Sequence, residues 1–266
     1  VRRGEDRVSD ELVRLEVMDG VATVTLDSPA NRNALSRALM AGLEDSLDAA
    51  IIDEGVRLIV LTGAGPVFCS GADLKERGGV SEQGRGGGPG GLVTVLKQIW
   101  YSPKPVIARV NGPARAGGLG LIAACDIAVA AEGATFGFSE VRIGVIPAII
   151  SVVTLPKLGP TKGMELFLTG ETFDAGEAVR LGLLNAAVPS DQLDECVGRY
   201  AGAILRGAPG ALAGCKRLVR EVPGMSIDAA FELTAALSAE FFTSADAREG
   251  MAAFAEKRPP RWAQGL

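Results

Sequence analysis

The chain is organised around residues 103 to 147, which read PKPVIARVNGPARAGGLGLIAACDIAVAAEGATFGFSEVRIGVIP. The run Val106 to Val110 is apolar and β-branched, which predicts a buried strand, and the turn residues after it end that strand. Gly117-Gly118 then opens a short helix, and a second apolar strand is expected over 127–131. The pattern is strand, turn, helix and strand, which favours an α/β fold.

Two features of this stretch carry chemistry. Backbone N–H groups at a helix start that is opened by glycine are free, and they lie at the positive end of the helix dipole. The turn at Gly117 can therefore hold a negative oxygen close to the main chain. Glu140 follows the second strand in an aromatic and glycine-rich segment. The sequence offers one oxyanion-binding turn and one carboxylate in apolar surroundings.

Composition sets limits on location and partners. The 266 residues are 47% hydrophobic, which indicates a large core or apolar surface buried between subunits. The net charge of −5 argues against nucleic acid as a partner, because binding phosphates requires a concentrated basic face. Neither an apolar run long enough for a membrane span nor a signal-peptide segment is evident. We therefore expect no membrane association and a cytoplasmic location.

The chain contains no histidine. A serine triad with histidine, most zinc sites and any imidazole base are therefore excluded, and acid–base chemistry falls to carboxylates, lysine, tyrosine or water. The four cysteines have neither metal-ligand nor redox spacing, so we expect buried, reduced thiols and no metal.

The elements around the central stretch follow from periodicity and turn residues. Two alternating runs flank Asp19-Gly20, a strong hairpin signal. The apolar run Ala148 to Val153 predicts a core helix, and the glycine-rich stretch from Glu76 to Gly91 predicts a mobile loop. The other predicted elements are a helix through Leu39, Leu43, Leu47 and Ile51, a strand over 58–62, and helices over 91–101, 161–168, 175–181, 191–206, 209–221, 227–242 and 244–257.

The chain resembles the crotonase superfamily, the enoyl-CoA hydratases and isomerases, from about Leu12 to Trp262. The motifs that carry the resemblance are Gly71-Ala72-Asp73-Leu74-Lys75, Asn111-Gly112, Gly117-Gly118, Cys125-Asp126, Phe136-Gly137 and Glu140. The resemblance implies an α/β fold with a spiral core of ββα units over 1–195. It also implies a C-terminal helical region over 196–266 that packs into homotrimers, often paired as hexamers, through apolar residues such as Phe231 and Phe242.

The resemblance also assigns roles to individual residues. It implies that the N–H groups of Ala72 and Gly117 grip the thioester carbonyl as it becomes an enolate, and that Glu140 is the acid–base residue. Ala72, Asp73, Leu74 and Lys75, together with Gly117, would border the CoA moiety, and Lys257 would reach a CoA phosphate. A solvated charge at a helix end is the alternative for Lys257. CoA is part of the acyl-CoA substrate here, so no separate cofactor is expected.

One position departs from the family pattern. Family hydratases commonly hold water with two glutamates, and one of them follows the paired glycines by two residues, where this chain has Gly120. A single carboxylate beside an oxyanion hole permits double-bond isomerisation as well as hydration. We predict a hydratase acting through Glu140, with an isomerase as the alternative and a non-catalytic acyl-CoA-binding protein as a rival class.

The residues around Glu140 look like a branch of hydratases that act on branched or carboxylated enoyl-CoAs. Arg115 and Arg142 could face a substrate carboxylate, although a surface ion pair is the simpler role for each. The segment Gly118 to Ala123 also matches a dinucleotide fingerprint, but several strands precede it and its acidic residue is misplaced, so we do not expect nicotinamide binding.

Overall fold

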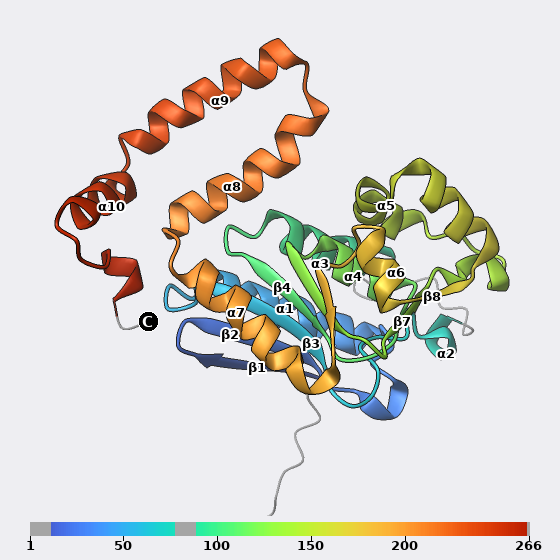
Figure 1. Ribbon diagram of the computed structural model, residues 1–266. Helices are drawn as coiled ribbons and strands as arrows, with labels where there is room; N and C mark the ends of the chain where they lie inside the picture. The colour runs from blue at the N-terminus through green and yellow to red at the C-terminus, as the bar shows by residue number, and fades with distance from the viewer. Residues whose placement is uncertain (1–11, 78–88, 265–266) are drawn as a thin grey trace, which may run out of the picture.

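A six-stranded sheet forms the centre of the molecule, and helices cover both of its faces (Figure 1). The computed structural model describes residues 12–77 and 89–264, so most of the predicted glycine-rich loop lies outside the described residues. The strand order is β1-β2-β3-β4-β6-β9; β1 is antiparallel to β2 and the later pairs are parallel. The strands are β1 (Val13–Met18), β2 (Val21–Leu26), β3 (Leu58–Gly63), β4 (Val106–Val110), β6 (Ile127–Ala131) and β9 (Ala186–Val188).

The hairpin at the edge of the sheet is confirmed. Asp19 and Gly20 both have positive φ, 50° and 79°, and Met18 pairs directly with Val21 across the turn. A two-residue loop with two positive φ angles matches the right-handed twist of the flanking strands. The Asp-Gly pair therefore sets the register of the first two strands.

The buried strands divide their side chains between two apolar cores. In β3, Ile59 and Leu61 belong to the larger core, whereas Leu58 and Val60 belong to the smaller one on the opposite face. Successive side chains of a strand point to opposite faces, so a strand covered on both sides is apolar throughout. Helices α1 (Arg37–Ile52), α3 (Pro89–Tyr101) and α4 (Gly117–Ala124) pack on the larger core, and α7 (Leu193–Leu205) packs on the smaller one.

A second, three-stranded sheet completes the core. It consists of β5 (Ala114–Arg115), β7 (Thr135–Gly137) and β8 (Thr172–Asp174), in that order. The remaining core elements are α2 (Leu74–Arg77), the 3₁₀ helix η2 (Ser139–Ile143), α5 (Ala148–Thr169) and α6 (Ala175–Arg180), and Asp174 caps α6 as predicted. Helix α5 is interrupted at Gly159, whose φ of 69° is not helical, which explains why the sequence predicts two separate helices there.

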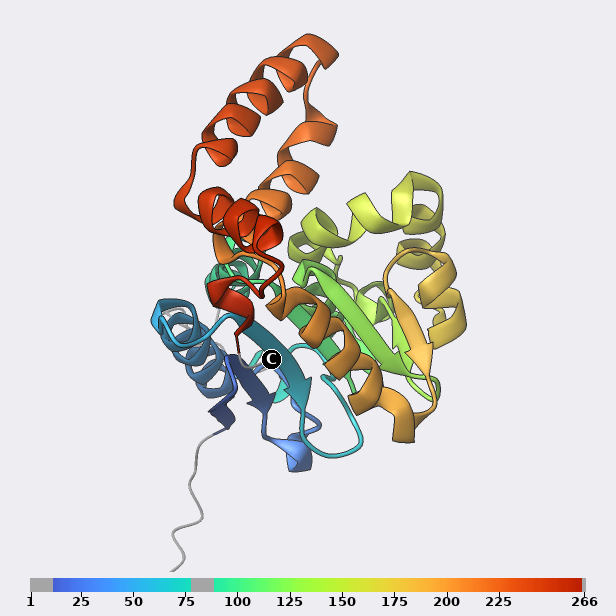
Figure 2. The ribbon, with the colours of Figure 1, turned by 60° about the vertical axis from the view of Figure 1, so that its left-hand side comes forward.

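Three helices extend away from this body, as the orange and red ribbon shows in both views (Figures 1 and 2). They are α8 (Pro209–Glu221), α9 (Ile227–Phe242) and α10 (Ala245–Ala255). The predicted boundary between residues 195 and 196 falls inside α7, which packs on the sheet through Leu193, Val197 and Leu205. We therefore propose that the boundary between the core and the helical region lies after α7.

None of the helices in the described ranges combines the length and apolar character that crossing a lipid bilayer requires.

Candidate active site

A cavity of about 380 Å³ brings together the three residues predicted to be catalytic. Ala72, Gly117 and Glu140 all line it, although they come from three different segments of the chain. Its wall also includes residues near the start of α1 and α3 and the segment from η2 into α5. The order of the chain separates these residues, and the packing of the segments places them around one space.

Close backbone packing joins the first two segments. The N–H of Arg115 donates to the carbonyl of Cys69 over 3.0 Å, and Cys69 bridges Ala114 in parallel. A Cβ added to Gly118 would lie 2.8 Å from the Cys69 oxygen, and one added to Gly71, which has a φ of 88°, would lie 3.1 Å from the Arg115 oxygen. Glycine is required at both positions because the two main chains touch there.

Two backbone donors remain free where these segments meet. Leu35 donates to the Gly71 carbonyl and accepts from the Asp73 N–H, so the N–H of Ala72, between them, points away from Leu35. Gly117 is the first residue of α4, where an N–H has no acceptor within the helix. Within the part of the chain that the structure describes, neither N–H has a hydrogen-bond acceptor. Both donors are available to an oxyanion.

The backbone is strained beside one of these donors. Ala116, immediately before α4, has a φ of 47° and a ψ of −118°, a conformation that residues other than glycine rarely adopt. Such a residue costs about 1–3 kcal/mol and persists only where the surrounding contacts enforce it. Its N–H donates to the Gly137 carbonyl over 3.2 Å, which ties the turn to the second sheet. The strain aims the start of α4 at the cavity.

Aromatic packing fixes the segment that carries Glu140. Phe138, which precedes η2, is fully buried, and its ring centroid lies 4.8 Å from that of Phe167 in an edge arrangement. Phe173 stacks on it from the second sheet at 6.3 Å. Such pairs add about 0.5–1.5 kcal/mol beyond the area they bury. The first turn of η2, which holds Glu140, is thereby anchored to α5 and β8.

One oxygen of the Glu140 carboxyl group lacks a polar partner. The residue is half-buried, and its Oε2 atom is buried without a hydrogen-bond partner among the described residues. Burial disfavours the charged form and raises the pKa of Glu140 above its ordinary value. A carboxyl group with a raised pKa, in the same cavity as free N–H groups, is suited to exchanging a proton with a bound molecule.

The position of the missing second glutamate is filled by packing. A Cβ added to Gly120 would lie 2.4 Å from Cγ2 of Ile150, a buried residue of α5. All eight residues of α4 are buried, so packing also accounts for the glycines of the apparent dinucleotide fingerprint. Among the described residues that line the cavity, Glu140 is the only carboxylate.

The residues predicted to contact CoA fall into two groups. Ala72, Leu74 and Gly117 line the cavity, and Lys75 is exposed beside them at the start of α2. The carboxylate of Asp73 instead accepts from the Asn31 side chain over 2.7 Å and from the Lys75 N–H over 2.9 Å. The hydrogen bond from Asn31 is the main reason that the pKa of Asp73 is lowered. Asp73 shapes the start of α2 and does not line the cavity.

Lys257 lies apart from the cavity of its own chain. It follows α10, which stands on the opposite side of the molecule from α2 (Figure 1). The two arginines near the site also have structural partners: Arg115 donates to Thr135, and Arg142 pairs with Glu171 over 2.7 Å. Neither arginine lines the cavity.

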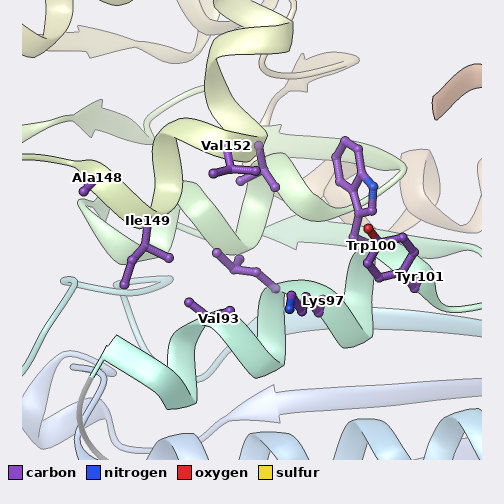
Figure 3. Close-up of a pocket in the computed structure, with 9 residues that line it drawn as sticks. Val93, Lys97, Trp100, Tyr101, Ala148, Ile149 and Val152 are labelled. Atoms are coloured by element: carbon purple, nitrogen blue, oxygen red, sulfur yellow. The ribbon is translucent and has the colours of Figure 1, made fainter. Parts of the chain in front are cut away.

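The sequence did not indicate a second cavity, of about 440 Å³, between α3 and the first turns of α5 (Figure 3). Ala148 and Ile149 line both cavities. The predicted core helix over 148–153 is correct for Ile150 and Val153, which are buried, but Val152 is 73% exposed and faces this space. The apolar run over 148–153 could not indicate the second cavity, because residues that line an apolar cavity and residues buried in a core give the same hydrophobic pattern.

These features define an α/β protein with two free amides beside one desolvated carboxylate, an arrangement suited to stabilising an enolate. The sequence model of the family described as Enoyl-CoA hydratase/isomerase matches residues 16–265. An enoyl-CoA hydratase of Mycobacterium tuberculosis is 38% identical over 244 residues, which cover 90% of this chain and 91% of that protein. The rat mitochondrial enoyl-CoA hydratase domain-containing protein 3 is 35% identical, over 92% of this chain and 82% of that protein.

The fold comparison agrees. The crystal structure of an enoyl-CoA hydratase from Mycobacterium smegmatis superposes with a TM-score of 0.86 at 34% identity, covering 94% of this chain and 98% of that one. The chain belongs to the enoyl-CoA hydratase/isomerase family, the crotonases, and has their α/β fold. The predicted family and fold class are confirmed.

Proposed function

We propose that the protein is an enoyl-CoA hydratase that adds water across the 2,3 double bond of a 2-enoyl-CoA thioester. One observation carries the proposal: Glu140, whose Oε2 atom is buried without a partner, lines the same cavity as Ala72 and Gly117 with their two free N–H groups. Hydration needs a group that moves a proton from water to carbon and donors that stabilise the enolate formed in between.

The reaction balances with these three groups. The Ala72 and Gly117 amides donate to the thioester oxygen, and Glu140 accepts a proton from water as the water oxygen bonds to the β carbon. The electron pair of the double bond then resides in the enolate. Glu140 returns the same proton to the α carbon and regains its charge. Losing one oxyanion donor typically costs about 3 kcal/mol in the barrier, so the amides carry a large share of the rate enhancement.

For CoA, we propose contacts with the exposed segment at the start of α2. Leu74 lines the cavity, and Lys75 places a cation beside its mouth, where it can meet a phosphate. Lys257 does not line the cavity of its own chain, and α10, which it follows, stands on the opposite side of the molecule from α2 (Figure 1), so its predicted role would involve a second copy of the protein.

An oligomer accounts for the surface of the helical region. Phe231, Phe242 and Phe254 are 70–87% exposed, and within the described residues of α9 only Leu237 is buried. Exposed aromatic clusters of this kind mark subunit interfaces. We propose a homotrimer or a dimer of trimers built through α8 to α10. A mass measurement in solution tests this, and a monomeric mass at micromolar concentration would refute it.

Isomerisation is the second candidate, and Gly120 favours it. Ile150 fills the space where a second carboxylate would lie, so water has to be oriented by Glu140 together with backbone or substrate groups. One carboxylate suffices to move a proton from the α carbon of a 3-enoyl-CoA to its γ carbon, which shifts the double bond into conjugation with the thioester.

Three substrates separate the possibilities: crotonyl-CoA, 3-methylglutaconyl-CoA and 3-hexenoyl-CoA, each incubated in ¹⁸O-labelled water. Hydration adds labelled water to the product mass and removes the absorbance of the conjugated thioester. Isomerisation of 3-hexenoyl-CoA increases that absorbance without a change in mass. Acyl-CoA binding without either change would show a non-catalytic member of the family, and the hydratase proposal would be wrong.

A further inference from the structure

The second cavity is almost entirely apolar and shares two wall residues with the first. It lies between α3 and the first turns of α5, and Lys97 is the only charged residue among the described residues that line it. Ala148 and Ile149 belong to the walls of both cavities. The two cavities therefore adjoin at Ile149, where the tail of a molecule bound at Glu140 would enter the second one.

Figure 3 gives this path a direction. Ala148 and Ile149 lie at one end of the space, opposite Val93, whereas Trp100 and Tyr101 lie at the other end of α3. Because the shared residues mark the end near Glu140, Trp100 stands at the far end. Its indole ring is the largest side chain in that wall.

The region between the two cavities excludes charge. A Cβ on Gly120 would lie 2.4 Å from Ile150, which lines the first cavity, and 3.7 Å from Leu96, which lines the second. Both side chains are buried and apolar. A carboxylate lying between Ile150 and Leu96 would be desolvated without a partner, which is costly, whereas a methylene chain gains from burial there.

A side chain of α8 packs against the indole ring of Trp100. The guanidinium carbon of Arg220, on α8, lies 4.4 Å from the centroid of the indole ring, a cation–π contact. Arg220 also pairs with Asp126 over 2.6 Å, and Lys216 pairs with the other oxygen of Asp126 over 2.7 Å. The side chains of Arg220 and Lys216 are only 14% and 9% exposed, so their positions are fixed.

We propose that Trp100 forms the end wall that sets the length of acyl chain the site accepts, that Arg220 is the positioning residue that holds this wall, and that the substrate tail is uncharged. The inference rests on the proposed function, because it requires an acyl thioester at Glu140. It departs from the carboxylated substrates that the sequence suggests. A helix of a second copy is the competing occupant of the cavity.

The selectivity follows from burial. Each methylene that enters an apolar pocket gains about 0.8 kcal/mol, or roughly a fourfold increase in kcat/KM. The increase continues along the series crotonyl-, 2-hexenoyl- and 2-octenoyl-CoA until the tail meets the indole, and kcat/KM falls for longer chains because a packed wall resists extra volume.

The first test observes Trp100 directly and does not depend on turnover. The chain has two tryptophans, so Trp262→Phe leaves Trp100 as the only indole. Saturated octanoyl-CoA shifts the emission of this variant, whereas acetyl-CoA does not. The matched control is Trp100→Phe, which keeps Trp262 and responds to neither ligand.

The second test measures chain-length profiles. Trp100→Leu opens the end wall and raises the ratio of kcat/KM for 2-dodecenoyl-CoA to that for crotonyl-CoA by about tenfold or more, the equivalent of two methylenes. Arg220→Met shifts the ratio in the same direction by a smaller factor, and Arg220→Lys by less still, because an ammonium stacks less well than a guanidinium. Trp262→Phe leaves the profile unchanged.

Three results would overturn the proposal. Octanoyl-CoA could bind without any response from Trp100, while Trp100→Leu retains the wild-type profile. The Trp100 variants could change the oligomeric mass but not the profile, which would place a second copy in the cavity. A preference for a dicarboxylic enoyl-CoA that is lost in Lys97→Met would show a charged tail. If no acyl-CoA of any length binds, the proposed function itself is wrong.

Discussion

Asp126 and Glu140 are two carboxylates in the interior of one protein, and their surroundings are opposite. Asp126 meets Lys216 at 2.7 Å, Arg220 at 2.6 Å and the N–H of Val106 at 2.7 Å. Glu140 keeps one oxygen buried without a partner among the described residues. A buried carboxylate with all its hydrogen bonds and counter-charges in place stabilises the fold. A buried carboxylate without partners is less stable in its charged form, and such groups are typical of sites that bind or react with a substrate.

Replacing Glu140 should have the largest effect. Glu140→Gln keeps the shape of the side chain but cannot accept the proton of water, so we expect turnover to fall by about a thousandfold or more. Binding of a saturated acyl-CoA should change little, because the amides of Ala72 and Gly117 remain. Steady-state kinetics and calorimetric titration measure the two quantities. Glu132→Gln, at an exposed position, is the control, and full activity in Glu140→Gln would place the base elsewhere.

Removing the charge of Asp126 should instead cost stability. Asp126→Asn leaves Lys216 and Arg220 buried without a counter-charge, and breaking such a pair costs about 3 kcal/mol. Denaturant unfolding measures the loss. The matched control is Asp194→Asn: Asp194 pairs with Arg109 at 2.6 Å but is 81% exposed, so the loss should stay below about 1 kcal/mol. Equal losses in the two variants would remove the distinction between buried and surface pairs.

A smaller effect is expected where α4 packs on α5 beside the site. Gly120→Ala places a methyl 2.4 Å from Cγ2 of Ile150, and overpacking of this kind costs about 1–3 kcal/mol, partly offset by about 1 kcal/mol of helix propensity. Ile150→Leu removes the branched methyl at nearly constant volume. The double variant should therefore be more stable than the sum of the single variants predicts, and strict additivity in unfolding experiments would contradict the contact.

The smallest expected effect is a gain in thermal stability when Glu140 is replaced by glutamine. Burial raises the pKa of Glu140 above its ordinary value of 4.5, so the folded state binds this proton more tightly than the unfolded state. Ionisation of Glu140 therefore lowers stability as the pH rises through the raised pKa. Glu140→Gln should melt at a slightly higher temperature than the wild type at neutral pH. The difference should vanish below the ordinary pKa, where both states are protonated. Thermal unfolding at several pH values tests the sign, and a lower melting temperature for Glu140→Gln at neutral pH would contradict it.

The sequence predicts local structure well where one residue type permits one geometry. Asp19-Gly20 specifies a hairpin, alternating and continuous apolar runs specify β1 to β4 and β6, and Asp174 specifies a helix start, all as found. The short strands β5, β7, β8 and β9 were not predicted. The segments that carry Ala72, Gly117 and Glu140 are recognisable because the close approach of their main chains requires glycine at fixed positions and because Glu140 is an isolated carboxylate in an apolar stretch. These residues do line one cavity.

Other features could not be predicted, because they depend on contacts between distant segments. The boundary predicted before residue 196 cuts α7, since a helical periodicity does not show whether the helix packs on a sheet. Val152 was predicted to be buried but is exposed, because hydrophobicity along a helix does not show which of its faces is covered. The hydrogen bond from Asn31 to Asp73 likewise joins segments 42 residues apart, and the motif around Asp73 does not reveal it.

By itself, the sequence determined the family, the hairpin, and the longer strands and helices, and it pointed to three residues that line one cavity, because backbone conformation and apolar periodicity are local properties. Only the tertiary structure decided that Ile150 occupies the place of a second carboxylate and that Arg220 braces Trp100. It also decided that the cavity of Glu140 shares wall residues with a second, apolar one. Each of these is a matter of which side chains share a space, and that is set by the packing of whole elements.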